Sequence, residues 1–386
     1  MNADSDRPIV LSCGMGLDSV ALLTRWLLDA SSRDFDLSRL TVLTAMTGEE
    51  YPRTGDLMTR HVLPLLRDRA VRYVQLSRAG QSSRSGYTVL DDSTAPTVMH
   101  MRGPWRLSDE LRASATVPQV AHGRRLCSVR AKAEPLDAWI AEHIGADYIH
   151  ALGFGVEERR RIDRDTTYTT NARRPIYPLA DWGWDRRRCL DYLRDVYQVT
   201  WERSTCTFCP FQIYNPDELA ERWRSTPVAA ADALALEHAA MACNPRSMLF
   251  GRTSARAFAA AHVLPLPPER AGRWALLEIR RVFTARRGQP TGKGPAWRSL
   301  RRLAVGDADH VRVELQRRAA AAGVGVVVDP AGIARAWLRH AGPPYPSAEH
   351  LLALAPAGPR DKQRAGFEAL WNAVSARPHH RNAART

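Results

Sequence analysis

Two short stretches of this 386-residue chain carry residue types that could do chemistry. The first runs from Ser12 to Ser19, where Gly14 and Gly16 alternate with larger residues and an Asp-Ser pair ends the segment. Glycines let the backbone approach a phosphate closely, and the free N–H groups and dipole of a helix N-terminus favour negative charge. The stretch is therefore predicted to cradle an anion, although no Walker A ending is present. An ordinary tight strand-to-helix turn is the alternative.

The second stretch is a Cys-x-x-Cys-Pro motif formed by Cys206 and Cys209. Two intervening residues allow both thiolates to reach one metal ion from a tight turn, and the proline prevents a helix from continuing. In a cytosolic chain such a pair binds metal or acts catalytically more often than it forms a structural disulfide. Cys127 would add a third thiolate, and Cys189 or Cys243 would complete a structural four-thiolate site.

Alternating strands and helices are expected to position these residues. Apolar runs predict buried strands at residues 9–11, 40–45, 71–76 and 148–152, with helices beginning near residues 18 and 54. This alternation predicts an α/β fold with a doubly wound parallel sheet. Ligands of such sheets bind beyond the carboxyl ends of the strands, where the glycine loop and Thr47-Gly48-Glu49 would both lie. For Glu49, an acidic helix N-terminus is the alternative.

Five ordered segments within residues 8–215 resemble the PP-loop ATP pyrophosphatase superfamily, in its phosphoadenosine-phosphosulfate-reductase-like branch. They are Ser12–Ser19, Thr47–Glu49, Arg124–Pro135, Gly153–Arg161 and Pro178–Trp182. The resemblance implies a Rossmann-type, adenine nucleotide alpha hydrolase-like fold and cleavage of ATP to AMP and pyrophosphate, which adenylates an oxygen. The chain departs from the family motif because Met15 replaces a glycine and Leu17 replaces a lysine. A lysine contact to phosphate must therefore come from elsewhere.

The resemblance also implies roles for individual residues. Nucleotide binding is expected from Ser12, Gly14, Met15, Gly16, Leu17, Asp18, Ser19, Thr47, Gly48, Lys132 and Gly153. Catalytic roles are expected for Asp18, Ser19, Glu49, Glu158 and Arg161, with Mg²⁺ neutralising charge on the leaving pyrophosphate. Arg124, Arg125 and Arg130 would contact phosphate, unless they are a solvated basic helix start. Cys127, Cys206 and Cys209 would hold a 4Fe–4S cluster whose open iron carries a sulfide, with zinc as the alternative.

Among thiolating relatives, the DNA phosphorothioation sulfurtransferases are the most similar. The predicted reaction is adenylation of a nucleic-acid oxygen followed by sulfur insertion, with DNA favoured over tRNA. The implied partners are a cysteine desulfurase or another sulfur donor and further subunits of a DNA-modification system. The alternatives are a tRNA-thiolating enzyme, an adenylyl-sulfate reductase-like enzyme and a non-catalytic nucleotide-binding module of a larger assembly. The reductase reaction needs a mobile cysteine near the C-terminus, and no cysteine follows Cys243.

Charge and composition add expectations about partners and location. The net charge is +14, and residues 271–386 hold 20 lysines and arginines against 8 aspartates and glutamates. Such an excess fits a polyanion partner, with arginine-rich genome bias as the alternative. No leader segment and no apolar run of membrane-spanning length are present, so the chain is expected to be soluble and cytoplasmic without a membrane partner.

Three regions are predicted along the chain. Residues 1–215 form the PP-loop domain with its cysteine cluster, residues 216–268 form a helical extension, and residues 269–386 form a basic, mainly helical C-terminal domain. Within the first region, the polar segment 78–124 is expected to be a lid or a mobile loop around one short helix near residues 107–112. The tail from Arg377 is expected to be disordered.

Overall fold

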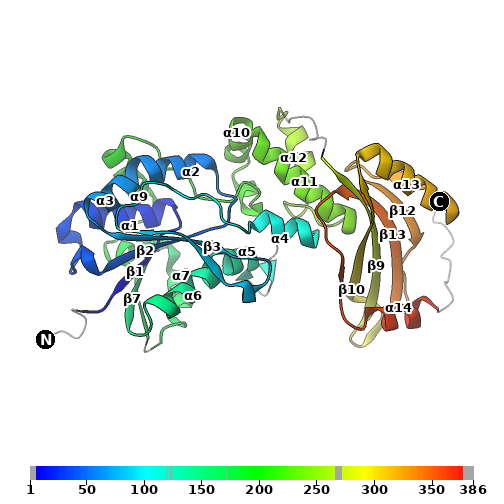
Figure 1. Ribbon diagram of the computed structural model, residues 1–386, viewed down its shortest axis with the longest axis horizontal. Coiled ribbons are helices and arrows are strands. Elements are labelled where there is room, and N and C mark those ends of the chain that lie inside the picture. The colour runs from blue at the N-terminus through cyan, green and yellow to red at the C-terminus, as the bar shows by residue number, and fades with distance from the viewer. Residues whose placement is uncertain (1–5, 119, 122–123, 171, 266–271, 377–386) are drawn as a thin grey trace. The chain divides into compact units, whose positions relative to one another are not determined.

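The computed structural model describes residues 6–118, 120–121, 124–170, 172–265 and 272–376, and Figure 1 shows their elements. The chain divides into two compact units. Unit 1 comprises Met1–Glu110 and Pro118–Cys209, and unit 2 comprises Leu111–Val117 and Pro210–Thr386. The boundaries expected at 215/216 and 268/269 stay predictions, and the second of them lies outside the described residues, as does the tail from Arg377. No helix of the described residues is both long and apolar enough to cross a membrane.

A six-stranded mixed sheet forms the centre of unit 1. Its strands are β1 (Ile9–Ser12), β2 (Leu40–Met46), β3 (Arg72–Arg78), β4 (Tyr87–Ser93), β7 (Tyr148–Leu152) and β8 (Arg173–Ile176). Their order across the sheet is β4-β3-β2-β1-β7-β8, and every neighbouring pair is parallel except β3 and β4. The predictions of an α/β fold and of the four buried strands are confirmed.

Helices pack against both faces of this sheet (Figure 1). One face is covered by α1 (Leu17–Leu28), α2 (Pro52–Leu57), α3 (Leu63–Asp68) and α9 (Arg186–Tyr197), with the π-helical turn η3 (Met58–Val62) joining α2 to α3. The other face is covered by α6 (Glu134–His143). Successive side chains of β1 point to opposite faces of the sheet. Leu11 therefore packs with α1, and Val10 packs with Trp139 of α6.

Shorter elements lie between these strands and helices in the chain. They are η1 (Ala30–Ser32), η2 (Leu37–Arg39), η4 (Ser83–Ser85), α4 (Leu107–Ser114), β5 (Val120–Ala121), β6 (Arg124–Arg125), α5 (Leu126–Ser128), η5 (Val129–Ala133), η6 (Val156–Glu158), α7 (Arg159–Thr166) and α8 (Pro178–Asp181). The short helix expected near residues 107–112 is confirmed as α4.

The polar segment 78–124 holds more regular structure than the sequence indicated. Strand β4 lies within it and forms the antiparallel edge of the sheet, so a structureless loop is the wrong description of residues 87–93. Only intermediate and exposed positions occur along β4, and its sequence therefore lacks the apolar run of a buried strand. The guanidinium of Arg72 donates to both carboxylate oxygens of Asp92, at 2.8 and 2.7 Å, and ties this edge to β3.

Unit 2 contains an antiparallel sheet, so the expectation of a mainly helical C-terminal region is wrong. Its strands are β9 (Trp274–Arg286), β10 (Gln289–Gly306), β11 (Val326–Val328), β12 (Ala334–Arg339), β13 (Ser347–Pro356) and β14 (Lys362–Gln363), in the order β11-β12-β13-β9-β10-β14. Its helices are η7 (Pro210–Tyr214), α10 (Pro216–Ser225), α11 (Pro227–Cys243), α12 (Ala255–Ala261), α13 (Ala308–Ala321) and α14 (Phe367–Ser375).

Strand β9 shows why the sequence of this region suggested helices. Leu276 packs against Val311 of α13, whereas its neighbour Leu277 packs on the opposite face with Met241 of α11. A strand that is buried on both faces loses the alternation of apolar and polar residues, and its apolar run resembles a piece of buried helix.

Candidate functional site

The glycine loop joins β1 to α1 in unit 1, at the carboxyl end of β1. Gly16 is the N-cap of α1 and no side chain of the described residues caps this helix, so its first N–H groups can bind an anion. Met15 has a φ of 58°, in the left-handed region that favours glycine, and its side chain is buried. A residue with a side chain is strained in this conformation, whereas glycine adopts it without strain.

Two residues near the cysteine pair form hydrogen bonds with the backbone of the loop. Trp201 Nε1 donates to the carbonyl of Met15 at 3.1 Å, and Ser204 Oγ donates to the carbonyl of Gly14 at 3.0 Å. Both carbonyls therefore accept hydrogen bonds from residues 201–204, and the N–H of Cys13 donates to the carbonyl of Leu43 at 2.8 Å. Sequence reasoning missed both contacts, because they join segments that are far apart in the chain.

Asp18 and Ser19 lie in the first turn of α1. Ser19 Oγ donates to the carbonyl of Gly16 at 3.1 Å, and Asp18 Oδ2 accepts from Arg186 at 3.4 Å. Burial raises the pKa of Asp18, while Arg186 lowers it and the carboxylates of Glu158 and Glu157 raise it. A carboxylate oxygen of this kind fits Mg²⁺, which would take its other ligands from water and phosphate.

Gly153 follows β7 and lies against the start of α1. A Cβ at this position would come within 2.8 Å of the backbone N and Cα of Ser19. Only glycine therefore lets the exit of β7 approach the loop this closely. The expected pair Glu158 and Arg161 is brought together as an ion pair, and the guanidinium of Arg161 lies 4.2 Å above the ring of Phe154.

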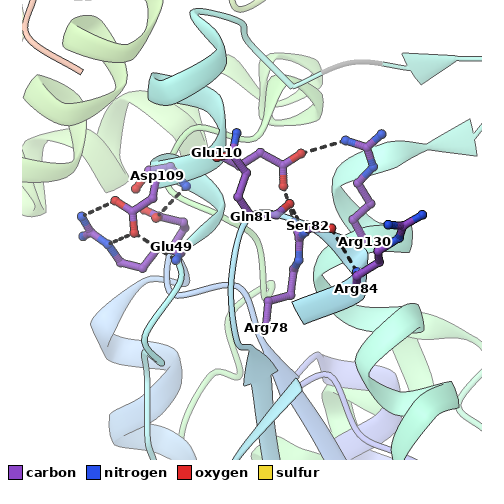
Figure 2. A network of polar contacts seen from close by, with 10 residues as sticks. Glu49, Arg78, Gln81, Ser82, Arg84, Asp109, Glu110 and Arg130 are labelled. Atoms are coloured by element: carbon purple, nitrogen blue, oxygen red, sulfur yellow. Dashed lines mark hydrogen bonds and ion pairs between the residues drawn. The ribbon is translucent and has the colours of Figure 1, made fainter. Parts of the chain in front are cut away.

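The Thr47–Glu49 segment follows β2, and Gly48 has a φ of 80°. Glu49 Oε1 accepts a hydrogen bond from the backbone N–H of Ser108 at 3.0 Å, and the N–H of Leu107 donates to the carbonyl of Thr47 at 2.9 Å. Glu49 thus stabilises the N-terminus of α4, which lies beside it in Figure 2. This contact is with a helix distant in the chain, whereas α2, the helix that follows Glu49, begins at Pro52 with no acidic residue in its first turn.

Figure 2 also shows Glu110 of α4 between two arginines. Its carboxylate forms ion pairs with the buried Arg78 and with Arg130, the second at 2.8 Å. Arg130, expected to contact phosphate, is therefore held by Glu110. Arg125 is exposed at the surface.

Lys132 lies in the π-helical turn η5 and reaches the Thr47 segment. Its Nζ is 3.2 Å from Oε1 of Glu50, whose side chain is 1% exposed. Burial lowers the pKa of Lys132, but Glu50 and the nearby Cys206 more than compensate, so that the pKa lies above its ordinary value. Glu50 also accepts hydrogen bonds from the backbone N–H groups of Thr47 and Glu49, at 3.3 and 3.2 Å. Sequence reasoning missed Glu50; its only signal was a second acidic residue after β2.

The cysteine turn packs against the same segment. Cys206 forms a single antiparallel bridge with Glu50, and the N–H of Thr207 donates to the carbonyl of Glu49 at 2.8 Å. Cys206 Sγ lies 3.4 Å from the hydroxyl of Thr47. Burial and then the charge of Glu50 raise the pKa of the Cys206 thiol, while Lys132 lowers it. The turn is tight, because the N–H of Cys209 donates to the carbonyl of Cys206 at 3.0 Å.

The remaining cysteines lie on other elements than the turn of Cys206 and Cys209. Cys127 lies in α5, where burial raises its pKa and Lys132 lowers it, and Cys189 is fully buried on the core-facing side of α9. Cys243 is buried in α11 of unit 2. Among the described residues, no group of three or more His, Cys, Asp or Glu side chains is placed to hold a metal ion. The iron–sulfur cluster and zinc stay predictions, and no chemistry is derived through them.

A series of side-chain hydrogen bonds, which the sequence analysis did not predict, begins at Ser12. Its hydroxyl lies 2.8 Å from Nε2 of His150 on β7, and Nδ1 of His150 accepts from Nε of Arg173 at 2.8 Å. Nη2 of Arg173 donates to both oxygens of Asp165, at 3.0 and 2.8 Å. A polar residue within the apolar run of β7 was the available signal.

Comparisons with known proteins find no match, neither to a family model, nor to a curated protein, nor to a solved structure. The geometry alone must therefore support a function. It gathers the loop, Gly153, the Thr47–Glu50 segment, Lys132 and Cys206 at the carboxyl ends of β1, β2 and β7.

Proposed function

We propose that the protein is an ATP pyrophosphatase that adenylates an oxygen of its acceptor. The observation that supports this best is the uncapped N-terminus of α1, with a left-handed residue in the preceding loop, at the point where the strand order reverses. The chain passes from β1 to β2 and β3 on one side, and β7 and β8 lie on the other. Open α/β sheets bind ligands beyond the strands at such a reversal. The same order, with helices on both faces, supports a doubly wound, Rossmann-type sheet of the adenine nucleotide alpha hydrolase kind.

Each part of the site has a place in this reaction. The amide groups of the loop and of the first turn of α1 bind the β- and γ-phosphates, and the hydroxyl of Ser12 adds a donor. Lys132 supplies the cation that the motif lacks at Leu17. Mg²⁺ held by Asp18 would neutralise the charge on the leaving pyrophosphate. The acceptor oxygen attacks the α-phosphorus, the bond to the pyrophosphate oxygen breaks, and the acceptor leaves the step as an AMP ester.

We further propose that the acceptor is a nucleic acid and that sulfur replaces the adenylated oxygen, with DNA favoured over tRNA. The outer sulfur of a persulfide on a donor protein such as a cysteine desulfurase would bond to the adenylated atom as AMP leaves. A thiol reductant would then cleave the S–S bond to the donor, leaving the sulfur on the acceptor and the donor as a free thiol. Further subunits of a DNA-modification system would assist. Two features support this part: Cys206 beside Thr47, and the excess of 20 basic over 8 acidic residues in the last part of the chain.

The test is to measure AMP and pyrophosphate release from ATP in the presence of DNA, tRNA or neither. We expect equal amounts of both products, and we expect Asp18→Ala to lower the rate by at least about 100-fold. Asp34→Ala, at an exposed position of the same unit, is the matched control and should retain the wild-type rate. A wild-type protein that binds ATP without releasing pyrophosphate would be a nucleotide-binding module. An active Asp18→Ala variant would contradict the assignment of the loop.

A further inference from the structure

We propose that His150 and Arg173 hold the hydroxyl of Ser12 as a hydrogen-bond donor to the bound phosphate, and that both are positioning residues of this site. The proposal rests on the proposed function, because it assumes that the loop binds the phosphates of a nucleotide. Three neighbouring strands supply the chain of contacts: Ser12 ends β1, His150 lies on β7 and Arg173 begins β8.

The protonation of His150 follows from its partners. An arginine side chain can only donate hydrogen bonds, so the contact from Nε of Arg173 requires an unprotonated Nδ1 on His150. A neutral imidazole then carries its single proton on Nε2. This nitrogen is the one that faces Ser12, at 2.8 Å, and it must therefore donate to the hydroxyl oxygen. Burial and the charge of Arg173 lower the pKa of His150 to about 4, which agrees with a neutral ring.

The proton on Nε2 of His150 determines how the hydroxyl of Ser12 can form hydrogen bonds. A serine hydroxyl can both donate and accept, but here a lone pair is used by His150 and the proton is left for another acceptor. In the described part of the chain, His150 is the only side chain that forms a hydrogen bond with Ser12 Oγ. Ser12 is the first residue of the loop, so a phosphate oxygen in the loop is the acceptor that this geometry fits. The opposite tautomer would accept the proton of Ser12 and remove this donor from the site.

Asp165 fixes the orientation of the Arg173 side chain at the end of this series of hydrogen bonds that is farthest from Ser12. Nη2 of Arg173 bonds to both oxygens of Asp165 on α7, and the hydroxyl of Tyr177 donates to the same carboxylate at 2.8 Å. These partners hold the guanidinium in a position from which Nε points at His150. Arg173 and Asp165 are themselves largely buried, with side chains 13% and 19% exposed, so water competes little for these bonds.

The test combines single and double variants. Ser12→Ala and His150→Phe should each weaken ATP binding about tenfold, the value expected for one hydrogen bond to a charged group. Because His150 acts through Ser12, the double variant should bind ATP no more weakly than either single variant. Tyr148→Phe is the matched control: it lies on the same strand, and Tyr148 and His150 are both 8% exposed. Calorimetry measures the dissociation constants, and denaturant unfolding confirms that each variant is folded.

The outcomes separate the two proposals. Independent, multiplicative losses in the double variant would overturn the role of His150 even in an enzyme that cleaves ATP. A wild-type protein that binds ATP without cleaving it, but shows the non-additive losses, would overturn only the proposed function. If His150→Phe does not fold, the ¹⁵N shifts of the His150 ring in the wild-type protein decide. A proton on Nε2 alone supports the proposal, and a proton on Nδ1 overturns it.

Discussion

His150 is a histidine that the fold keeps neutral, and this has a consequence for stability in acid. Burial and then Arg173 lower its pKa from 6.5 to about 4. The unfolded chain binds the proton near pH 6.5 and the folded chain only near pH 4. The free energy of unfolding should therefore fall as the pH decreases from about 6.5 to about 4, by roughly 3 kcal/mol.

Urea titrations between pH 4 and pH 7 check this expectation. His150→Phe should be less stable than the wild type at pH 7, and the difference should shrink by roughly 3 kcal/mol as the pH is lowered to 4. Tyr148→Phe should keep a constant difference from the wild type. A constant difference for His150→Phe as well would mean that another group causes the acid sensitivity.

The pair of Lys132 and Glu50 is a second feature at this scale. Lys132→Met leaves the buried carboxylate of Glu50 without its cation, so we expect a loss of about 3 kcal/mol in the free energy of unfolding. The double variant Lys132→Met/Glu50→Gln should regain part of this loss, because the uncompensated charge is gone. Lys362→Met, at an exposed position in β14, is the control and should stay within about 0.5 kcal/mol of the wild type. An equal loss in the single and double variants would show that the charge of Glu50 is unimportant.

At the scale of elements, Gly153 governs how closely β7 approaches α1. In Gly153→Ala, the new Cβ would clash with backbone atoms of Ser19, and backbone cannot move aside as a flexible side chain can. We expect a loss of about 1–3 kcal/mol in stability and a weaker affinity for ATP. Gly325→Ala is the control, because a Cβ there has no atom within 4 Å. Calorimetry with ATP and thermal unfolding measure both effects, and an unchanged affinity would place the phosphates away from this contact.

Strands could be predicted from the sequence where their residue pattern reflects how they are buried. Strands β1, β2, β3 and β7 are apolar runs because each is covered by helices or by neighbouring strands. The edge strand β4 and the strand β9 do not show their surroundings in this way. The first is partly solvated, and the second is buried on both faces.

The same distinction holds for the site. Spacing within a short segment indicated the glycine loop and the cysteine turn. The contacts of Ser204 with Gly14 and of His150 with Ser12 join residues that are 190 and 138 positions apart. Only the folded chain brings such residues together, so no local pattern could have revealed them.

At the scale of the whole molecule, the site lies in unit 1, while unit 2 carries much of the positive charge. The turn between β9 and β10 exposes Arg286 and Arg287, and in the described residues neither forms an ion pair with a carboxylate. If a nucleic acid binds here, replacing both with Gln should reduce the slope of log affinity against log salt by up to about 2. Arg312→Gln/Arg317→Gln, at positions already paired with Asp309 and Glu314, should change the slope less. Fluorescence anisotropy with duplex DNA at several salt concentrations measures the slopes, and equal slopes for all variants would exclude this turn.

The hydrogen bonds from Trp201 and Ser204 to the loop can form only late in the synthesis of the chain. Gly14 leaves the ribosome long before Ser204, which is 190 residues behind it. At about 5–20 residues per second, the loop waits roughly 10–40 s for this contact to become possible. During that interval the residues of β1 and α1 have been synthesised, but Trp201 and Ser204 have not. A chain whose synthesis stops before Trp201 therefore contains the glycine loop but neither of the side chains that hydrogen-bond to its carbonyls.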